Sequence, residues 1–345
     1  AERRFIAPEA REGEARHRFN WNAPFFVSVH DPKVLYTAAN TVFKLEERGD
    51  KWTKVSPDLT TKDPDKMITV GSNAETYCTV VSMAESPIQP GVLWTGSDDG
   101  LVFVTKNDGK LWENVTPPTC NGRYVSRVEA SNHDVARAYL TLDGHRSDDY
   151  APCVMVTDDF GSTWREITGN LPERRSCMVV REDRTNPDVL YVGTENAVHV
   201  SLDRGATWVK LHGKALPTVP VYDIKQHARE KDLVLGTHGL SIWVLDGAGW
   251  ISELTPEVMA KPLHLFSIAP ARPKWFHEYS GLWTHKVFRS PNPPEGVKID
   301  YWISEYTGDD LSIVVENDKG VQVKKLTGSN APGYNRVTWD LVPEE

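Results

Sequence analysis

The sequence predicts an all-β protein in which a β-propeller is followed by part of a small β-sandwich. Three observations support this fold class: a recurring octapeptide, longer repeats that contain it, and the lack of any pattern typical of a long amphipathic helix. Twelve Trp and 23 Pro among 345 residues also favour a β-protein with many turns over a helical one.

The octapeptide occurs in three copies that share an Asp or Asn, a Gly and a Trp, the pattern of the Asp-box. The Asp or Asn can accept hydrogen bonds from its own turn, the Gly can adopt a positive φ, and the Trp can pack between sheets. We therefore expect a structural role rather than an active site. The three sets are Asn107, Gly109 and Trp112 in the loosest copy, Asp159, Gly161 and Trp164, and Asp203, Gly205 and Trp208.

Five longer repeats surround these motifs, and each reads as about four short strands bounded by turn residues, which is typical of a propeller blade. They span residues 20–59, 75–117, 122–172, 176–217 and 219–254. Residues 1–18 form an N-terminal extension without a blade pattern, and the chain starts without Met or the apolar core of a signal peptide. We expect at least five blades within residues 19–260, as part of a larger propeller whose earlier blades lie upstream.

Two further segments follow the repeats. Residues 261–290 are irregular and aromatic, as in a strap or linker packed against the propeller, and include Trp275, Phe276, Tyr279 and Trp283. Residues 291–345 contain alternating strands at 297–303, 311–316, 321–326 and 336–341, which predict a β-sandwich. Four strands make a thin sheet, so we expect this domain to be incomplete or completed by something else.

Composition excludes several classes of function. A net charge of −9 argues against nucleic-acid binding, and no apolar run is long enough to span a membrane. Four cysteines without a CxxC motif argue against a zinc site; both buried free thiols and one or two disulfides are compatible with them. Serine-hydrolase, P-loop and dinucleotide motifs are absent.

From Arg18 onward the chain resembles bacterial proteins of the Asp-box (BNR) repeat superfamily, often labelled sortilin-like, VPS10-like or glycosyl-hydrolase-like. The residues that carry the resemblance are 18–24, 30–32, 124–131, 142–149, 232–239 and 242–246, and in the tail 292–296 and 333–340. The resemblance implies a C-terminal portion of such a protein, an immunoglobulin-like fold for the partial sandwich, and export to the periplasm, cell surface or medium. It implies no reaction, because one fold hosts many functions.

Three acids are candidate ligand-binding residues because each precedes the aromatic residue of the next strand by nine or ten positions: Glu85, Glu129 and Glu182. If the first strand of each blade lines the channel, these acids lie near one rim, where they can bind a cation or a sugar. Alternatively, each pairs with a neighbour such as Arg127 or Arg181.

The remaining candidates are polar or aromatic residues in loops. One set is a dense polar loop that mixes an imidazole, a guanidinium and carboxylates, as acid–base and metal sites do: His145, Arg146, Asp148 and Asp149. The others are His238 beside a Gly, and Trp21 with Asn22, which suit sugar stacking or blade packing. No catalytic residue is assigned, no cofactor is expected, and a bound cation such as calcium stays open.

Three hypotheses of function follow. The first is an exported propeller that binds a protein, peptide or glycan without catalysis, with a second chain or the upstream segment completing the ring. The second is a glycoside hydrolase of the Asp-box xyloglucanase type, which requires two carboxylates facing one sugar. The third is an assembly factor like the photosystem-associated Asp-box propellers. Carboxylates held by arginines instead of converging in an open groove would count against the hydrolase.

Overall fold

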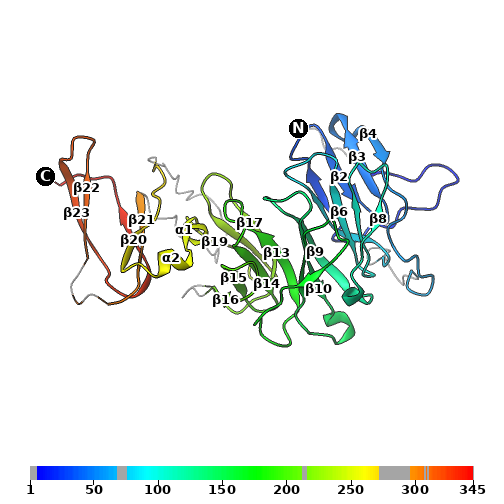
Figure 1. Cartoon of the computed structure of the whole chain (residues 1–345). Coiled ribbons are helices and arrows are strands. Elements are labelled where there is room, and N and C mark those ends of the chain that lie inside the picture. The colour runs from blue at the N-terminus through cyan, green and yellow to red at the C-terminus, as the bar shows by residue number, and fades with distance from the viewer. Residues whose placement is uncertain are drawn as a thin grey trace, which may run out of the picture. The chain divides into compact units, whose positions relative to one another are not determined.

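The computed structural model describes residues 6–67, 76–211, 216–271, 296–306, 308 and 311–344. The chain divides into two compact units (Figure 1). Unit 1 comprises Ala1–Gln226 with Val234–Trp243, and unit 2 comprises His227–Leu233 with Val244–Glu345. Among the described residues, no helix has the length and apolar character needed to cross a bilayer.

Four successive antiparallel sheets of four strands each, called blades 1 to 4, make up most of unit 1. In every one the strands pair in chain order, β1-β2-β3-β4 and so on, so each blade is a simple meander. Blade 1 contains β1 (Phe25–Val27), β2 (Leu35–Ala38), β3 (Val42–Glu46) and β4 (Lys51–Lys54); blade 2 contains β5 (Val80–Glu85), β6 (Leu93–Ser97), β7 (Val102–Thr105) and β8 (Glu113–Asn114). Blade 3 contains β9 (Tyr124–Ala130), β10 (Ala138–Asp143), β11 (Val154–Thr157) and β12 (Arg165–Glu166); blade 4 contains β13 (Cys177–Glu182), β14 (Leu190–Thr194), β15 (Val198–Ser201) and β16 (Val209–Lys210).

The fifth repeat departs from this plan. Within the described residues it has three strands, β17 (Val221–Gln226), β18 (Leu233–Thr237) and β19 (Ile242–Leu245), and is called blade 5. The predicted fifth repeat extends to residue 254 and includes Trp250, but this residue begins the short helix α1 (Trp250–Glu253), which α2 (Pro256–Met259) follows. Apart from these helices, the part of the chain that the structure describes contains three single 3₁₀ turns: η1 (Glu47–Gly49), η2 (Pro118–Cys120) and η3 (His145–Ser147).

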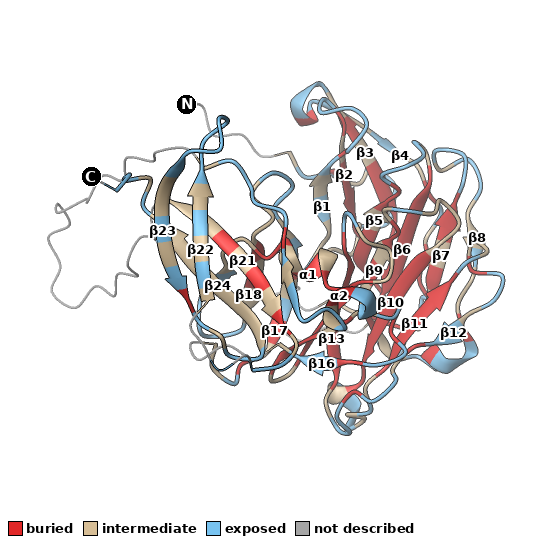
Figure 2. Ribbon diagram, turned by 60° about the vertical axis from the view of Figure 1, so that its left-hand side comes forward, coloured by how far each residue is buried: buried red, intermediate tan, exposed pale blue. Residues whose placement is uncertain are grey.

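The core of unit 1 lies between neighbouring blades. The middle strands carry unbroken buried runs, as β6, β10 and β14 show (Figure 2), because both of their faces are covered by adjacent sheets. One cluster joins blades 2 and 3 through Trp94, Val104, Val128, Leu140 and their neighbours. A series of meanders stacked face to face through apolar clusters is consistent with a propeller.

The three Asp-box turns connect each blade to the blade before it. The indole Nε1 of Trp112 donates to the Val55 carbonyl at 2.8 Å, and Trp164 donates to Val115 at 2.7 Å. Trp208 donates to the Ile167 carbonyl at 2.9 Å and is almost fully buried. Each carbonyl immediately follows the fourth strand of the previous blade or its extension, so the indole fastens two blades together.

A glycine is required at the same turns for two reasons. Gly161 and Gly205 both have φ of +85°, a region that disfavours residues with a Cβ. A Cβ on Gly205 would also lie 2.9 Å from Cβ of Ile167 in the previous blade. The turn therefore serves the close approach of two blades as well as its own hairpin.

The N-terminal extension packs against blade 1 instead of standing apart. Ile6 and Phe19 contact the buried cluster of Ala39, Phe43 and Leu45. The His17 ring meets the Phe43 ring edge-on at 4.8 Å between centroids. This segment thus covers an apolar face of blade 1.

Unit 2 contains a three-stranded sheet of order β20-β21-β24 and the hairpin β22-β23. Their bounds are β20 (Leu263–Leu265), β21 (Val297–Ile303), β22 (Leu311–Glu316), β23 (Gln322–Gly328) and β24 (Gly333–Trp339). β20 corrects the expectation of an irregular strap over 261–290, since it pairs with β21 in regular register. The aromatic residues predicted for that strap beyond residue 271 lie outside the described residues, and the immunoglobulin-like topology stays a prediction.

Candidate functional site

The first strands of all five blades line one inner cavity of about 690 Å³ in unit 1. Side chains from β1, β5, β9, β13 and β17 contribute to its wall. One part of the wall is apolar. It is formed by Phe25 and Val27 on β1 and by Val29 just after it, whose side chains are about half exposed. Another part is charged and comes from blades 3 to 5.

Arg181 of β13 organises the charged part of the wall. Its Nε donates to the Ile224 carbonyl at 2.7 Å, and its Nη2 donates to Asp223 at 2.7 Å. Its Nη1 donates to the carboxylate of Glu129 on β9. One guanidinium therefore joins the first strands of blades 3, 4 and 5.

Arg127 of β9 adds a second cation two residues before Glu129. Its Nη2 donates to the Tyr222 carbonyl and to Asp223, both at 3.2 Å. Its Nε is buried without a hydrogen-bond partner among the described residues. Lys225 of β17 also lines the cavity, and no hydrogen bond or ion pair of its ammonium occurs within the described residues.

The pKa shifts in this cluster follow from burial and crowding of like charges. Burial, and then the neighbouring Arg181, lower the pKa of Arg127 to about 10. Burial and Arg181 also lower the pKa of Lys225. Burial alone would raise the pKa of Asp223, but Arg127 and Arg181 outweigh it and hold that pKa below its usual range. We call Arg127, Arg181 and Lys225 the cationic cluster; three positive groups face two carboxylates, Glu129 and Asp223.

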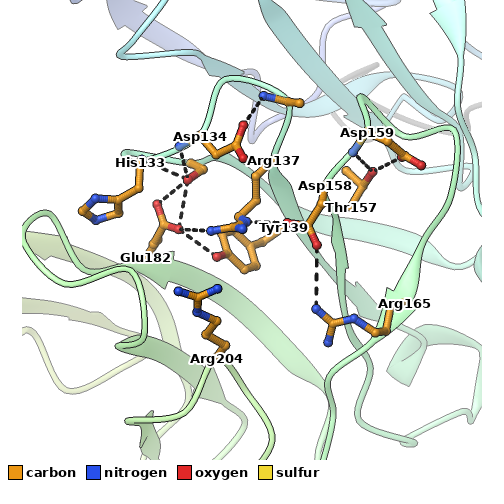
Figure 3. Close-up of polar contacts among 12 residues, drawn as sticks. His133, Asp134, Arg137, Tyr139, Thr157, Asp158, Asp159, Arg165, Glu182 and Arg204 are labelled. Carbon is orange, nitrogen blue, oxygen red and sulfur yellow. Dashed lines mark hydrogen bonds and ion pairs between the residues drawn. The ribbon is translucent and has the colours of Figure 1, made fainter. Parts of the chain in front are cut away.

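Of the three acids singled out by spacing, only Glu129 belongs to this cluster. Glu182 is buried between blades 3 and 4, where it accepts hydrogen bonds from the Ser131 hydroxyl and the Asn132 N–H. It also accepts one from the Tyr139 hydroxyl (Figure 3). Glu85 likewise accepts from the Ser28 hydroxyl and the Val29 N–H at the joint of blades 1 and 2. Both carboxylates join blades; Glu85 also lines the inner cavity together with Glu129, whereas Glu182 lies outside its lining.

Glu129 differs from Glu85 and Glu182 because its position in the strand pairing is shifted by one residue. Glu85 pairs with Leu93 and Glu182 pairs with Leu190, but the equivalent position in blade 3 is Ala130, which pairs with Ala138. Glu129 pairs with Tyr139 and so points to the other face of its strand. A spacing of ten residues, in place of nine, thus moves this carboxylate from the joint to the cavity.

The joint between blades 2 and 3 lacks a carboxylate and is apolar instead. Ala130 stands where the acceptor would be, and Pro87 has no N–H to donate. Trp94 fills the joint and is fully buried, with its ring stacked on Phe160 at 6.5 Å between centroids. At the joint of blades 4 and 5, the amide of Gln226 donates to Asp183 at 2.7 Å.

The predicted polar loop divides its residues between different tasks. The buried carboxylate of Asp143 accepts from Nδ1 of His145 at 2.7 Å and contacts Arg146. Arg146 lines the inner cavity and lies over the Tyr124 ring, 4.9 Å from its centroid. Asp149 forms an ion pair with Arg123, and Asp148 has a left-handed backbone at the end of η3. Only Arg146 of the four predicted loop residues therefore lines the cavity.

The other candidates lie at or near the cavity. Asn22 lines it, whereas Trp21 is 74% exposed and lies outside the lining. The His238 ring packs against Tyr222, with 5.3 Å between centroids. Within the described ranges no cluster of three His, Cys, Asp or Glu side chains could hold a metal ion. All four cysteines are buried free thiols.

Sequence reasoning missed Asp223 and Lys225 and named Arg127 and Arg181 only as partners for acids. A signal was present, because Asp223 and Lys225 alternate with apolar residues along the first strand of a blade. Alternation puts both side chains on one face.

No protein-family model matches the sequence, and no curated protein matches it. Solved structures with similarity include "YCF48 bound to D1 peptide" at 13% identity and a TM-score of 0.42, covering 66% of this chain and 66% of that chain. A GH74 xyloglucanase from Xanthomonas campestris shows 14% identity and a TM-score of 0.49, covering 86% of this chain and 43% of that one. The extracellular domain of the putative one-component system BT4673 from B. thetaiotaomicron shows 13% identity and a TM-score of 0.44, covering 71% of this chain and 28% of that chain. The chain thus spans 66% of the first protein's length and less than half of the others, and none of these similarities identifies its ligand or reaction.

Proposed function

We propose that unit 1 is a non-catalytic binding module whose inner cavity takes an acidic segment of a peptide or protein. The observation that carries the proposal is the unbalanced cationic cluster. Its three cations face only two carboxylates, and Arg127 Nε and the Lys225 ammonium have no partner among the described residues. An anionic ligand group would form charge-assisted hydrogen bonds with these two donors and would be stabilised there.

A peptide fits the rest of the wall better than a glycan does. Phe25, Val27 and Val29 offer exposed apolar surface for side chains. Sugars stack on open aromatic faces, but two of the aromatic rings in the lining, Tyr124 and Tyr222, pack against other side chains. Arg146 lies over Tyr124, and His238 packs against Tyr222.

Glycoside hydrolysis fits the cavity poorly. It needs one carboxylic acid that holds a proton and a second carboxylate that faces the sugar. Glu129 and Asp223 both bond to Arg181, and the lowered pKa of Asp223 keeps it ionised. A pair of carboxylates neutralised by one guanidinium supplies neither a proton donor nor an open nucleophile.

Binding of a labelled hexaglutamate peptide at low ionic strength, followed by fluorescence anisotropy, tests the proposal. Because the whole chain carries a net charge of −9, general attraction would favour hexalysine, whereas the cationic cluster should favour hexaglutamate. Lys225→Ala should weaken hexaglutamate binding, and added salt should weaken it further. Failure of the wild type to bind hexaglutamate would refute the proposal, and preference for polygalacturonate would point to an acidic glycan.

Three finer assignments belong to the same proposal: membership of the Asp-box repeat superfamily, an immunoglobulin-like sandwich in unit 2, and export from the cell. The regular contacts of the Asp-box turns with the preceding blades support the first. Fractionation of cells producing the full-length protein tests the third. Size-exclusion chromatography with light scattering tests whether a second chain completes the ring.

A further inference from the structure

Glu129 is held less firmly than Asp223, the other carboxylate that faces the cationic cluster. Among the described residues its carboxylate has one partner, Nη1 of Arg181, and its side chain keeps 18% exposure to the cavity. Asp223 is bound by Arg181, by Arg127 and by the Ile224 N–H. A carboxylate anchored at one point can rotate away without breaking a network, whereas Asp223 cannot.

Arg181 stays in place without Glu129. Its Nε bond to the Ile224 carbonyl and its Nη2 bond to Asp223 fix the plane of the guanidinium. An arginine remains charged when buried, so Nη1 requires an acceptor at all times. When Glu129 leaves, a fixed and charged donor therefore faces the cavity.

We propose that Glu129 is an internal competitor that sets the ligand specificity of the cavity. In the free protein its carboxylate occupies Nη1 of Arg181, and a carboxylate of the acidic ligand exchanges with it on binding. Lys225 lies close enough to interact electrostatically with Glu129 and would stabilise the displaced side chain. This inference rests on the proposed function and assigns Glu129 a role within it.

The exchange explains how an acidic chain can select among acidic ligands. A ligand must offer enough negative charge to displace Glu129 and also to satisfy the unpartnered donors of Arg127 and Lys225. A single carboxylate replaces one contact with an equal one and gains little, whereas neighbouring carboxylates gain additional contacts. Discrimination against weakly acidic ligands by a built-in like charge is a recognised route to specificity.

The test compares hexaglutamate binding by the wild type, Glu129→Gln and Glu166→Gln. Glutamine keeps the size of the side chain and one acceptor oxygen, but it removes the charge that competes. Glu166 lies exposed on β12, so its variant controls for the change in net charge alone. Thermal unfolding followed by circular dichroism checks that each variant is folded.

We expect Glu129→Gln to lower the Kd for hexaglutamate by about fivefold or more, since a like charge at the contact is removed, and Glu166→Gln to leave it unchanged. The gain should shrink for a peptide with one glutamate. Equal or weaker binding by Glu129→Gln, with the wild type still binding, would overturn this inference and leave the proposed function standing. Absence of hexaglutamate binding by the wild type would refute the proposed function itself.

Discussion

Trp208→Ala should remove a large part of the stability of unit 1. The Trp208 side chain is 3% exposed and belongs to a cluster that includes Tyr139, Val156, Ile167 and Val192 from blades 3 and 4. Truncation of a buried Trp to Ala costs about 3–5 kcal/mol of unfolding free energy. The substitution leaves a cavity between two sheets.

Part of that cost comes from one hydrogen bond. The Nε1 of Trp208 is the donor for the Ile167 carbonyl at 2.9 Å, and loss of a buried bond of this kind costs about 1–2 kcal/mol. Trp208→Phe keeps most of the packed ring and loses the donor. Its expected cost is therefore well below that of Trp208→Ala, and the difference separates packing from hydrogen bonding.

Equilibrium unfolding in urea, followed by far-ultraviolet circular dichroism, measures these costs. Trp21→Ala is a suitable control because Trp21 is 74% exposed, and it should change the unfolding free energy by less than about 0.5 kcal/mol. The denaturant slope should stay the same in all variants if unfolding remains cooperative. A loss below about 1 kcal/mol for Trp208→Ala would refute the interpretation that this indole fastens blades 3 and 4.

Three other predictions address the joints and the buried acids. Glu182→Ala should cost about 3 kcal/mol of unfolding free energy, because it leaves three donors at a blade joint without their acceptor. A cost below about 1 kcal/mol in urea unfolding would contradict the role of Glu182 in joining blades 3 and 4. Gly205→Ala should lower the unfolding free energy more than Gly122→Ala does in the same assay. Both glycines have a positive φ, but only at Gly205 would a Cβ meet Ile167. Equal losses would mean that the close approach of the two blades at Gly205 does not contribute. Burial raises the pKa of Asp98 to about 6, above the ordinary 3.8, so its contribution to stability is complete below pH 3.8 and is lost as the pH rises through about 6. As the pH falls through this window, the difference in unfolding free energy between wild type and Asp98→Asn should therefore shift in favour of the wild type by about 1.4 kcal/mol per pH unit, and a pH-independent difference would contradict it.

The blades could be predicted from local sequence because their signals are local. Each repeat contains turn residues at fixed positions and apolar runs, which specify strands and hairpins without knowledge of distant residues. The fifth repeat shows where this fails. Its predicted range extends to residue 254, yet Trp250 begins a helix in unit 2.

The candidate site could be predicted only in part. The sequence pointed to first strands and charged residues, and Glu85, Glu129, Arg146 and Asn22 do line the cavity. It grouped Glu129 with Glu85 and Glu182 because spacing along a chain does not reveal the register of a sheet. Those two acids instead receive hydrogen bonds from turns of the preceding blade.

The sequence by itself determined that this chain forms consecutive four-stranded sheets with Asp-box turns, because hairpin chemistry depends on residues close together in the chain. Only the tertiary structure decided which charged groups meet. Glu129, Arg181 and Asp223 come from three different blades, and their contacts arise when the first strands converge around one cavity. The side of a strand on which a charge lies depends on a register of single residues, and burial then sets the pKa of each group.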